Sequence, residues 1–212
     1  MATISSLSDA CEALLLDASV VVNLNATGYS AQILSALPFN VLVPRPVIRE
    51  LRNGAAKGHA DATDLDELLN QSIVSEAPVV GAAQGEFIAL TSGFSVSSLG
   101  DGEAATIACA YSSGAWAAID ERKARRICAD RYQTIQVVST VDILAYDSVS
   151  ETLTEDEMAK SVFAALEVAN MHVHPEHLDW VTDWIDDHLL HRCLSLPRAI
   201  REKHLRSRKS AS

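Results

Sequence analysis

The chain has 212 residues, of which 48% are hydrophobic, and its formal net charge is −11. This length and composition are enough for one globular domain with a buried core, and they exclude a disordered chain. The negative charge argues against a passive nucleic-acid coat, because that role relies on Lys and Arg residues to neutralise phosphates.

The sequence predicts a cytoplasmic protein without structural disulfides. Its four cysteines lie far apart and form no C-x-x-C pair, which favours reduced thiols over disulfides or zinc ligands. The first basic residue is Arg45, so the N-terminal region lacks the positive segment of a signal peptide. The apolar stretch 13–24 is interrupted by Asp17 and is too short to span a bilayer, so no membrane contact is expected.

The first 50 residues alternate between strand-like and helical patterns. Residues 13–17 predict a buried strand, and residues 20–24 and 30–37 predict helical segments after it. Residues 40–43 predict a second strand. Pro46 suits the first turn of the helix that follows, where its missing N–H is no loss.

The middle of the chain is less regular. Residues 62–71 predict a helix, because leucines recur there at core spacing. Residues 72–96 favour a strand or a hairpin, although Pro and Gly interrupt the pattern. The next helix is predicted from Glu103 to about Ser113, with Gly114 as its C-cap.

Four further segments complete the alternation. Residues 115–120 and 134–139 predict strands, and helices are expected over residues 121–130 and 141–147. Strands that alternate with helices over short connections are typical of a parallel sheet covered on both faces. We therefore predict a three-layer α/β/α fold with a central, mainly parallel sheet.

Only helical patterns follow residue 150. Residues 154–171 and 175–190 predict amphipathic helices, and residues 197–212 carry six basic residues against one acid. We therefore expect a sheet domain over residues 1–147 and an α-helical C-terminal extension over 148–196 that packs on it. The basic tail is expected to be flexible, and it is either disordered or binds a partner.

Four acidic residues stand at the edges of hydrophobic segments. Asp17 and Asp120 each end a predicted strand, whereas Glu50 and Glu103 lie near the starts of predicted helices. An acid that ends a buried strand is costly to desolvate unless it is paired or bound to a cation. Taken singly, each acid is more often a solvated residue or a partner of a helix dipole. The joint pattern predicts one site for a hard divalent cation such as Mg²⁺ or Mn²⁺, because carboxylate oxygens suit these ions better than zinc.

Other residues near these acids are assigned supporting roles. Ser19 is placed to hydrogen-bond a ligand water or a phosphate. Asp101 is predicted to be a helix N-cap rather than a ligand, since Asp is a preferred N-cap residue. The residues after Asp120 either contact substrate phosphates or occupy an exposed helix face: Arg122, Lys123, Arg125 and Arg126.

Histidines form a second candidate cluster. His172, His174 and His177 lie close together in the sequence, and His188 and His191 follow at a helical spacing. A zinc site is one interpretation. Surface histidines in a connection between helices are the favoured alternative, because the spacing matches no standard metal pattern.

Five segments of the chain, in the right order, resemble motifs of the PIN domain family. The resemblance covers about residues 13–147, and Ser139 stands where a glycine is usual. The segments are 15–21 with a D-x-S motif, 47–51 with the glutamate-bearing helix, 99–108 with L-x-x-G-E-A-x-A-I-A, 118–126 with D-(D/E)-x-x-A-R, and 139–144 with G-T-x-x-x-L.

This resemblance implies a metal-dependent nuclease, commonly a ribonuclease, and many family members are VapC-like toxins held silent by an antitoxin. It implies that Asp17 is the central metal ligand, that Glu103 and Asp120 complete the ligand set, and that Glu50 holds a second ion or an outer water. It also implies RNA as substrate, Mg²⁺ or Mn²⁺ as cofactor, and a homodimer. Such ions lower the pKa of a bound water and neutralise charge on a phosphodiester.

Two other functions are compatible with the sequence. The first alternative is a binding or scaffold module that acts through residues 151–212. The second alternative is a phosphohydrolase that acts on small substrates. The aspartyl-phosphate type of phosphatase would need a second acid where the chain has Ser19, which disfavours that alternative.

Overall fold

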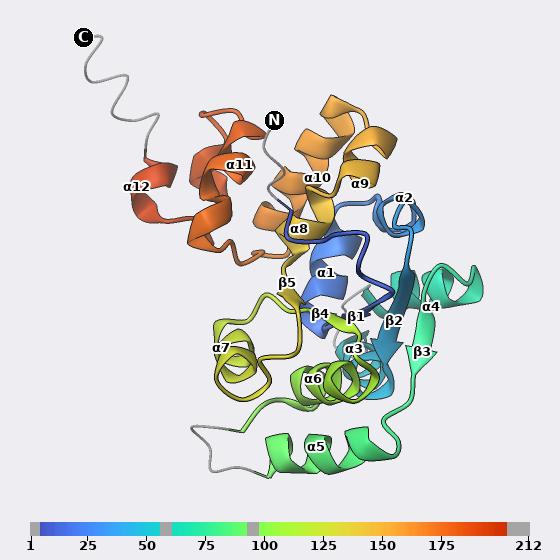
Figure 1. The fold of residues 1–212 in the computed structure, drawn as a ribbon. Coiled ribbons are helices and arrows are strands. Elements are labelled where there is room, and N and C mark those ends of the chain that lie inside the picture. Colours follow the sequence, from blue (N-terminus) through green and yellow to red (C-terminus); the bar gives the residue numbers. More distant parts are fainter. Residues whose placement is uncertain (1–4, 56–60, 93–97, 203–212) are drawn as a thin grey trace, which may run out of the picture.

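Five parallel strands form the centre of the protein in the computed structural model, which describes residues 5–55, 61–92 and 98–202 (Figure 1). The order across the sheet is β3-β2-β1-β4-β5. The first strand therefore lies between β2 and β4, and the segments that follow β1 and β4 meet at one edge. The strands are β1 Ala13–Leu16, β2 Asn40–Pro44, β3 Ser75–Ala77, β4 Trp116–Ala118 and β5 Val137–Val138.

Helices cover both faces of the sheet, which confirms the predicted three-layer α/β/α fold (Figure 1). Successive side chains of a strand point to opposite faces, so Leu14 and Leu16 enter one core cluster and Leu15 enters the other. All three are almost fully buried, and each contributes about 1.5–3 kcal/mol to folding by leaving water.

The two core clusters define which helices belong to which layer. The helices that pack in the cluster of Leu14 are α1 Ala18–Ala26, α2 Ser30–Ser35, α3 Arg45–Ala55, α4 Asp61–Asn70, α8 Thr140–Leu144, α9 Asp147–Thr152, α10 Glu155–Glu167 and α11 Leu178–Asp183. Those in the cluster of Leu15 are α5 Ala82–Thr91, α6 Asp101–Ser113 and α7 Arg122–Arg131.

The segment after β3 differs from the prediction. A strand or hairpin was expected over residues 72–96, but only β3 is extended, and α5 follows it. Gly81 has a φ of 58°, a left-handed conformation that suits glycine and turns the chain into α5. The apolar residues of this segment, including the buried Leu90, fit a helix as well as a strand because the run is short. Residues 93–96 of this prediction lie outside the described part of the chain.

The C-terminal helices pack on the sheet layers rather than standing apart. Helix α10 lies against α1, and α9 lies against α2. The helix predicted over residues 175–190 is shorter than expected: a 3₁₀ turn over Pro175–His177 leads into α11, which ends at Asp183. The N–H groups of Trp184 and Ile185 donate to carbonyls three residues earlier, and this tighter pattern ends the α-helix.

The last described residues include part of the segment that was predicted to be a basic tail. Pro197 precedes a short basic helix, α12 Arg198–Arg201, with a second 3₁₀ turn at Leu190–Arg192 before it. Residues 203–212 of the predicted basic tail lie outside the described residues. Across the described ranges, no helix is both long and apolar enough to cross a membrane.

A buried carboxylate joins the N-terminal segment, α8 and the C-terminal helices. Asp142 is only 1% exposed, and it accepts hydrogen bonds from the N–H and Oγ of Ser139 (2.7 and 2.6 Å) and from the N–H of Ser6 (2.7 Å). Nε2 of His177 lies 3.4 Å from its Oδ2. Burial alone would raise the pKa of Asp142, but the hydrogen bonds from His177, Ser139 and Ser6 outweigh burial and hold the pKa well below its usual range.

Candidate active site

Acidic residues from four segments converge at the carboxyl edge of the sheet. Asp17 follows β1 and is the N-cap of α1, while Asp120 comes two residues after β4. The N–H of Asp17 donates to the carbonyl of Ala118 (3.1 Å), which fixes the ends of the two strands side by side. Glu50 projects from α3 and Glu103 from the first turn of α6. The parallel sheet thus gathers residues that are up to 103 positions apart in the chain.

Asp17 is the central acid of this group. It is 3% exposed; Ser19 Oγ donates to its Oδ2 (2.9 Å), whereas its Oδ1 is buried and makes no hydrogen bond within the described residues. Burial raises the pKa of Asp17, and the charge of Asp120 raises it further against the hydrogen bonds at Ala18 and Ser19. A buried carboxylate oxygen with no partner is costly unless a cation or a proton meets it.

Gly102 allows α6 to approach two of the acids. A β-carbon at this position would lie 2.5 Å from Oε2 of Glu50 and 3.6 Å from Oδ1 of Asp17. Any side chain larger than hydrogen would therefore displace the carboxylate of Glu50. Glycine in the first turn of α6 brings Glu50 and Asp17 together on one side of the helix.

Asp120 is held by residues that the sequence analysis did not assign. It is 2% exposed, and it accepts hydrogen bonds from Asn23 Nδ2 (2.7 Å), from the N–H of Thr140 (2.9 Å) and from Thr140 Oγ1. Burial raises the pKa of Asp120, and these bonds offset only part of that effect. The signal for Asn23 in the sequence is its position four residues after Ser19, which puts both side chains on the same face of the helix. Thr140 belongs to the segment that resembles the last PIN motif.

Glu50 and Glu103 approach Asp17 from two helices. Burial raises the pKa of each, and the charge of Asp17 raises both further. Oε2 of Glu103 also accepts a hydrogen bond from the N–H of Gly100 (3.1 Å), as in a capping box. The four carboxylates therefore repel one another around Asp17, which favours either protons or a cation between them.

The predicted role of Asp101 as an N-cap is wrong. Gly100 is the N-cap of α6, and Asp101 is the first helical residue. The carboxylate of Glu103 already takes the N–H of Gly100, so the cap does not need the side chain of Asp101. Asp101 is instead exposed and pairs with Arg49 (3.1 Å).

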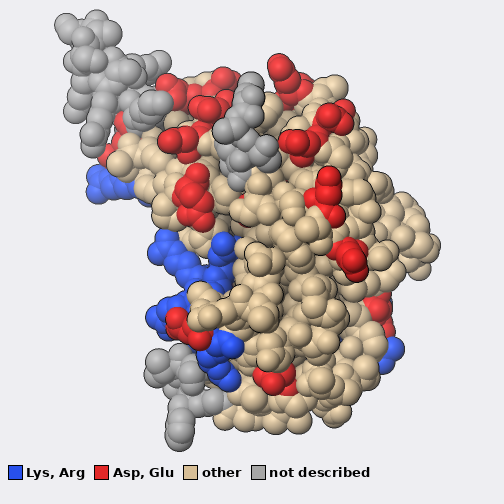
Figure 2. All heavy atoms as spheres, viewed as in Figure 1, with Lys and Arg blue, Asp and Glu red and all other residues tan. Residues whose placement is uncertain are grey.

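The basic residues after Asp120 lie in α7 and face different neighbours. Nε of Arg122 donates to Nε2 of His172 (3.0 Å), Lys123 Nζ donates to the carbonyl of Ser98 (2.6 Å), and Arg125 donates to the carbonyl of Ile119 (3.1 Å). Lys and Arg side chains gather on the edge of the molecule where α7 lies, whereas Asp and Glu predominate over the C-terminal helices (Figure 2). Arg126 lines a separate hollow with Arg125.

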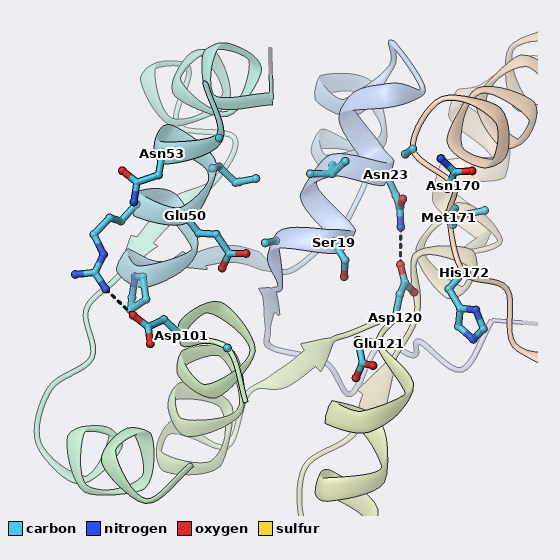
Figure 3. A pocket seen from close by; sticks show the side chains of 18 residues that line it. Ser19, Asn23, Glu50, Asn53, Asp101, Asp120, Glu121, Asn170, Met171 and His172 are labelled. Carbon is cyan, nitrogen blue, oxygen red and sulfur yellow. Dashed lines mark hydrogen bonds and ion pairs between the residues drawn. The ribbon is translucent and has the colours of Figure 1, made fainter. Parts of the chain in front are cut away.

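A cavity of about 870 Å³, called here the active-site cavity, is lined by Glu50 and Asp120 but not by Asp17 or Glu103. Figure 3 shows Glu50 extending from α3 into it, with Asn23 bonded to Asp120 on the other side. Its lining comprises Ala18, Ser19, Val22, Asn23, Pro46, Arg49, Glu50, Leu51, Asn53, Gly54, Gly100, Asp101, Asp120, Glu121, Ala169, Asn170, Met171 and His172.

The histidine cluster has partners of its own. His177 pairs with Asp142, the rings of His172 and His174 contact edge to face with centroids 5.0 Å apart, and Nδ1 of His191 lies 2.8 Å from the carbonyl of His188. Among residues 5–55, 61–92 and 98–202, no three His, Cys, Asp or Glu side chains are grouped closely enough, as placed, to hold a metal ion.

The acids nevertheless fit a hard divalent cation in their chemistry. All four donors are carboxylates, and Oδ1 of Asp17 is buried without a hydrogen bond in the described part of the protein. Burial raises the pKa of each acid, and repulsion from a neighbouring acid raises the pKa of Asp17, Glu50 and Glu103 further. Glu103 is turned toward Gly100, so its carboxylate would have to rotate, and the other acids would have to move closer together, before one cation could be shared.

These features define a parallel α/β/α protein with an acidic site at the carboxyl edge of its sheet. A family model described as a PIN domain matches residues 13–186, and the chain belongs to the PIN domain family. PIN domains are generally nucleases that bind nucleic acid and typically use divalent metals. Comparisons with curated proteins and with solved structures gave no match. The matched region includes α10 and α11 as well as the sheet.

Proposed function

We propose that this protein is a divalent-metal-dependent endoribonuclease that hydrolyses RNA phosphodiester bonds. The observation that carries the proposal is the convergence of four carboxylates around Asp17, whose Oδ1 is buried without a hydrogen bond among the described residues. Buried carboxylates that repel one another cost stability, and a cation bound between them would offset that cost.

The roles of the residues follow from their surroundings. Asp17, Asp120, Glu103 and Glu50 would hold Mg²⁺ or Mn²⁺. Such an ion supplies a water of lowered pKa and neutralises charge on the phosphodiester. Asn23 and Thr140 hold the carboxylate of Asp120 in a fixed orientation, and their hydrogen bonds favour its ionised form against the effect of burial. Ser19 holds Oδ2 of Asp17 and leaves Oδ1 for the cation.

The biological role that we propose is that of a VapC-like toxin restrained by an antitoxin protein. The support is the resemblance of residues 99–108 and 118–126 to one branch of PIN domains that contains such toxins. Expression of the chain alone should then arrest bacterial growth, and substitution of Asp17 should relieve the arrest. A homodimer is part of the same proposal, and light scattering of the purified protein tests it.

The direct test of the proposed function is metal-dependent RNA cleavage. Purified protein should cut single-stranded RNA when Mn²⁺ is added and should stop when EDTA removes it, because the carboxylates alone supply no nucleophile. Glu103→Gln is the matched variant: Gln still accepts the hydrogen bond from Gly100 but carries no charge. We expect this variant to melt like the wild type and to cut RNA at least about tenfold more slowly.

Two results would contradict the proposed function. One is cleavage that persists unchanged in EDTA. The other is cleavage by Glu103→Gln at the wild-type rate in material purified by the same procedure, since that would point to a contaminating ribonuclease.

Gly102→Ala tests the placement of Glu50 without removing any acid. The added methyl group would meet Oε2 of Glu50 at 2.5 Å, and the far end of that side chain can move aside. Alanine favours a helix over glycine by about 0.5–1 kcal/mol, so the thermal stability of the variant should be unchanged or slightly higher. Cleavage should nevertheless fall, with a higher Mn²⁺ concentration needed for half-maximal rate. An unchanged Mn²⁺ dependence would show that the position of Glu50 does not matter for the metal.

A further inference from the structure

The chain that leaves α10 forms a fixed wall of the active-site cavity. Residues 169–172 line the cavity on the side away from α3 (Figure 3). Asn170 has a φ of 54°, in the left-handed region that Asn tolerates better than most residues. The N–H of Met171 donates to the carbonyl of Ala165 (2.9 Å), and the Met171 side chain is 1% exposed in the core. These contacts anchor the turn before any substrate arrives.

His172 connects this wall to the basic helix α7. Its Nε2 accepts a hydrogen bond from Nε of Arg122 (3.0 Å). Burial, followed by the charge of Arg122, lowers the pKa of His172, which favours the neutral ring that can accept at Nε2. Among the described residues, His172 is the hydrogen-bond partner of Arg122, and this bond uses only Nε of the guanidinium group. The two Nη groups of Arg122 keep their donors for another acceptor.

The negative charge of the cavity explains why a cationic side chain such as Arg122 is important for substrate binding. The protein carries a net charge of −11, and the cavity itself is lined by Glu50, Asp101, Asp120 and Glu121. A polyanionic substrate is repelled by these carboxylates unless a cation stands close to the cavity. Arg49, the one Arg or Lys side chain that lines the described cavity, is already paired with Asp101. Arg122 does not itself line the described cavity, but two of its neighbours do: Glu121 precedes it in the chain, and His172 accepts its hydrogen bond.

We propose that Arg122 binds a phosphate of single-stranded RNA next to the bond that is cut, and that His172, presented by the fixed turn 169–172, is the positioning residue that orients its guanidinium. Arginine is suited to this role because its planar donors bind phosphate oxygens in pairs. The C-terminal helical region would thereby complete the substrate site of the sheet domain. The inference rests on the proposed function for the identity of the substrate as RNA, although it concerns binding rather than hydrolysis.

The test measures binding without cleavage. In an Asp17→Asn background, fluorescence anisotropy reports the Kd for an end-labelled oligouridylate at several salt concentrations. Arg122→Gln should raise the Kd about tenfold, and it should reduce the slope of log Kd against log salt by about 0.7, the contribution of one phosphate contact to a single strand. Arg131→Gln is the matched control at the far end of α7, where Arg131 lies over the ring of Tyr132. It should leave both quantities nearly unchanged.

His172 is tested by the choice of its replacement. His172→Ala should raise the Kd about threefold with little change in the salt slope, because Arg122 keeps its charge but loses its orientation. His172→Gln should restore most of the affinity, since Oε1 of Gln can reach the place of Nε2 and accept from Arg122. In the cleavage assay with intact Asp17, the His172→Ala variant should show the change in KM rather than in kcat.

The outcomes separate this inference from the proposed function. Equal effects of Arg122→Gln and Arg131→Gln, no effect of Arg122→Gln, or no binding by the Asp17→Asn parent would overturn the inference. Failure of Gln to rescue the His172→Ala defect would overturn the positioning role. A wild type that cuts no RNA with Mn²⁺, together with the predicted changes in Kd, would refute the nuclease proposal and leave the binding site standing.

Discussion

Asp17→Asn is expected to abolish RNA cleavage and, at the same time, to raise the melting temperature of the metal-free protein. The loss of rate should exceed the roughly 10–100-fold effect of removing a second-shell partner, because Asp17 is proposed as the central ligand. The gain in stability should be about 1 kcal/mol, which is about 2–4 °C for a chain of this size. It arises because Asn removes a buried charge whose Oδ1 has no hydrogen-bond partner among the described residues.

The pH dependence of this effect has a definite sign. The folded-state pKa of Asp17 is raised, so at neutral pH the folded protein holds the proton more tightly than the unfolded chain does. The metal-free wild type should therefore gain stability as the pH falls through that raised pKa, and it should be least stable above it. Asp17→Asn should flatten this part of the profile. Thermal melts in EDTA between about pH 5 and pH 8 measure both curves.

Asp101→Asn is the control for a surface acid near the same cavity. Asp101 is exposed and paired with Arg49, so its replacement should change neither cleavage nor melting temperature by much. Mn²⁺ at a hundredfold excess over its Kd should raise the free energy of unfolding of the wild type and of Asp101→Asn by about 2.7 kcal/mol. Their melting temperatures should rise accordingly, but that of Asp17→Asn should not. A lower melting temperature for metal-free Asp17→Asn would mean that the carboxylate stabilises the fold, against the metal-ligand role proposed for it.

The acids were predictable because a local rule and a topological rule agree on them. Asp17 and Asp120 end short apolar segments, which marks them as strand ends, and a parallel sheet puts such ends on one edge. Glu50 and Glu103 are not strand ends. They could be placed near that edge only because the motifs that contain them occur in the order found in PIN domains.

The partners of these acids could not be predicted in the same way. The hydrogen bonds of Asp120 to Asn23 and Thr140 join residues 97 and 20 positions apart, and no local pattern encodes them. The N-cap of α6 was misassigned because Asp101 has the stronger intrinsic preference for a cap, whereas the capping box of Glu103 decides the actual cap. The strand or hairpin predicted over residues 72–96 was wrong for a different reason, since a short apolar run does not distinguish a strand from a helix.

Asp142→Ala is expected to destabilise the protein by at least about 2 kcal/mol, because it leaves several buried donors without an acceptor at about 1–3 kcal/mol each. The substitution would leave the N–H groups of Ser6 and Ser139 without their acceptor and would leave His177 buried beside a void. Because the pKa of Asp142 is lowered in the folded state, its contribution is complete above the unfolded pKa of about 4 and is lost as the pH falls below it. Urea unfolding near pH 7 and under acidic conditions measures both effects.

The consequences should extend to the candidate active site, because Asp142 and Asp120 bind neighbouring residues. Asp142 holds Ser139 at the start of α8, and the next residue, Thr140, donates twice to Asp120. Asp142→Ala should therefore also reduce the stabilisation by Mn²⁺, although residue 142 is not a proposed ligand. The control is Asp156→Ala, which removes an exposed acid paired with Lys160 and should change stability by less than about 1 kcal/mol.

Two results would contradict this prediction. If the two variants lose similar stability, the buried contacts of Asp142 do not hold the N-terminal segment and the C-terminal helices against α8. If Asp142→Ala is strongly destabilised but keeps the full Mn²⁺ effect, the position of α8 does not control the orientation of Asp120. Asn23 alone would then be enough to orient that carboxylate.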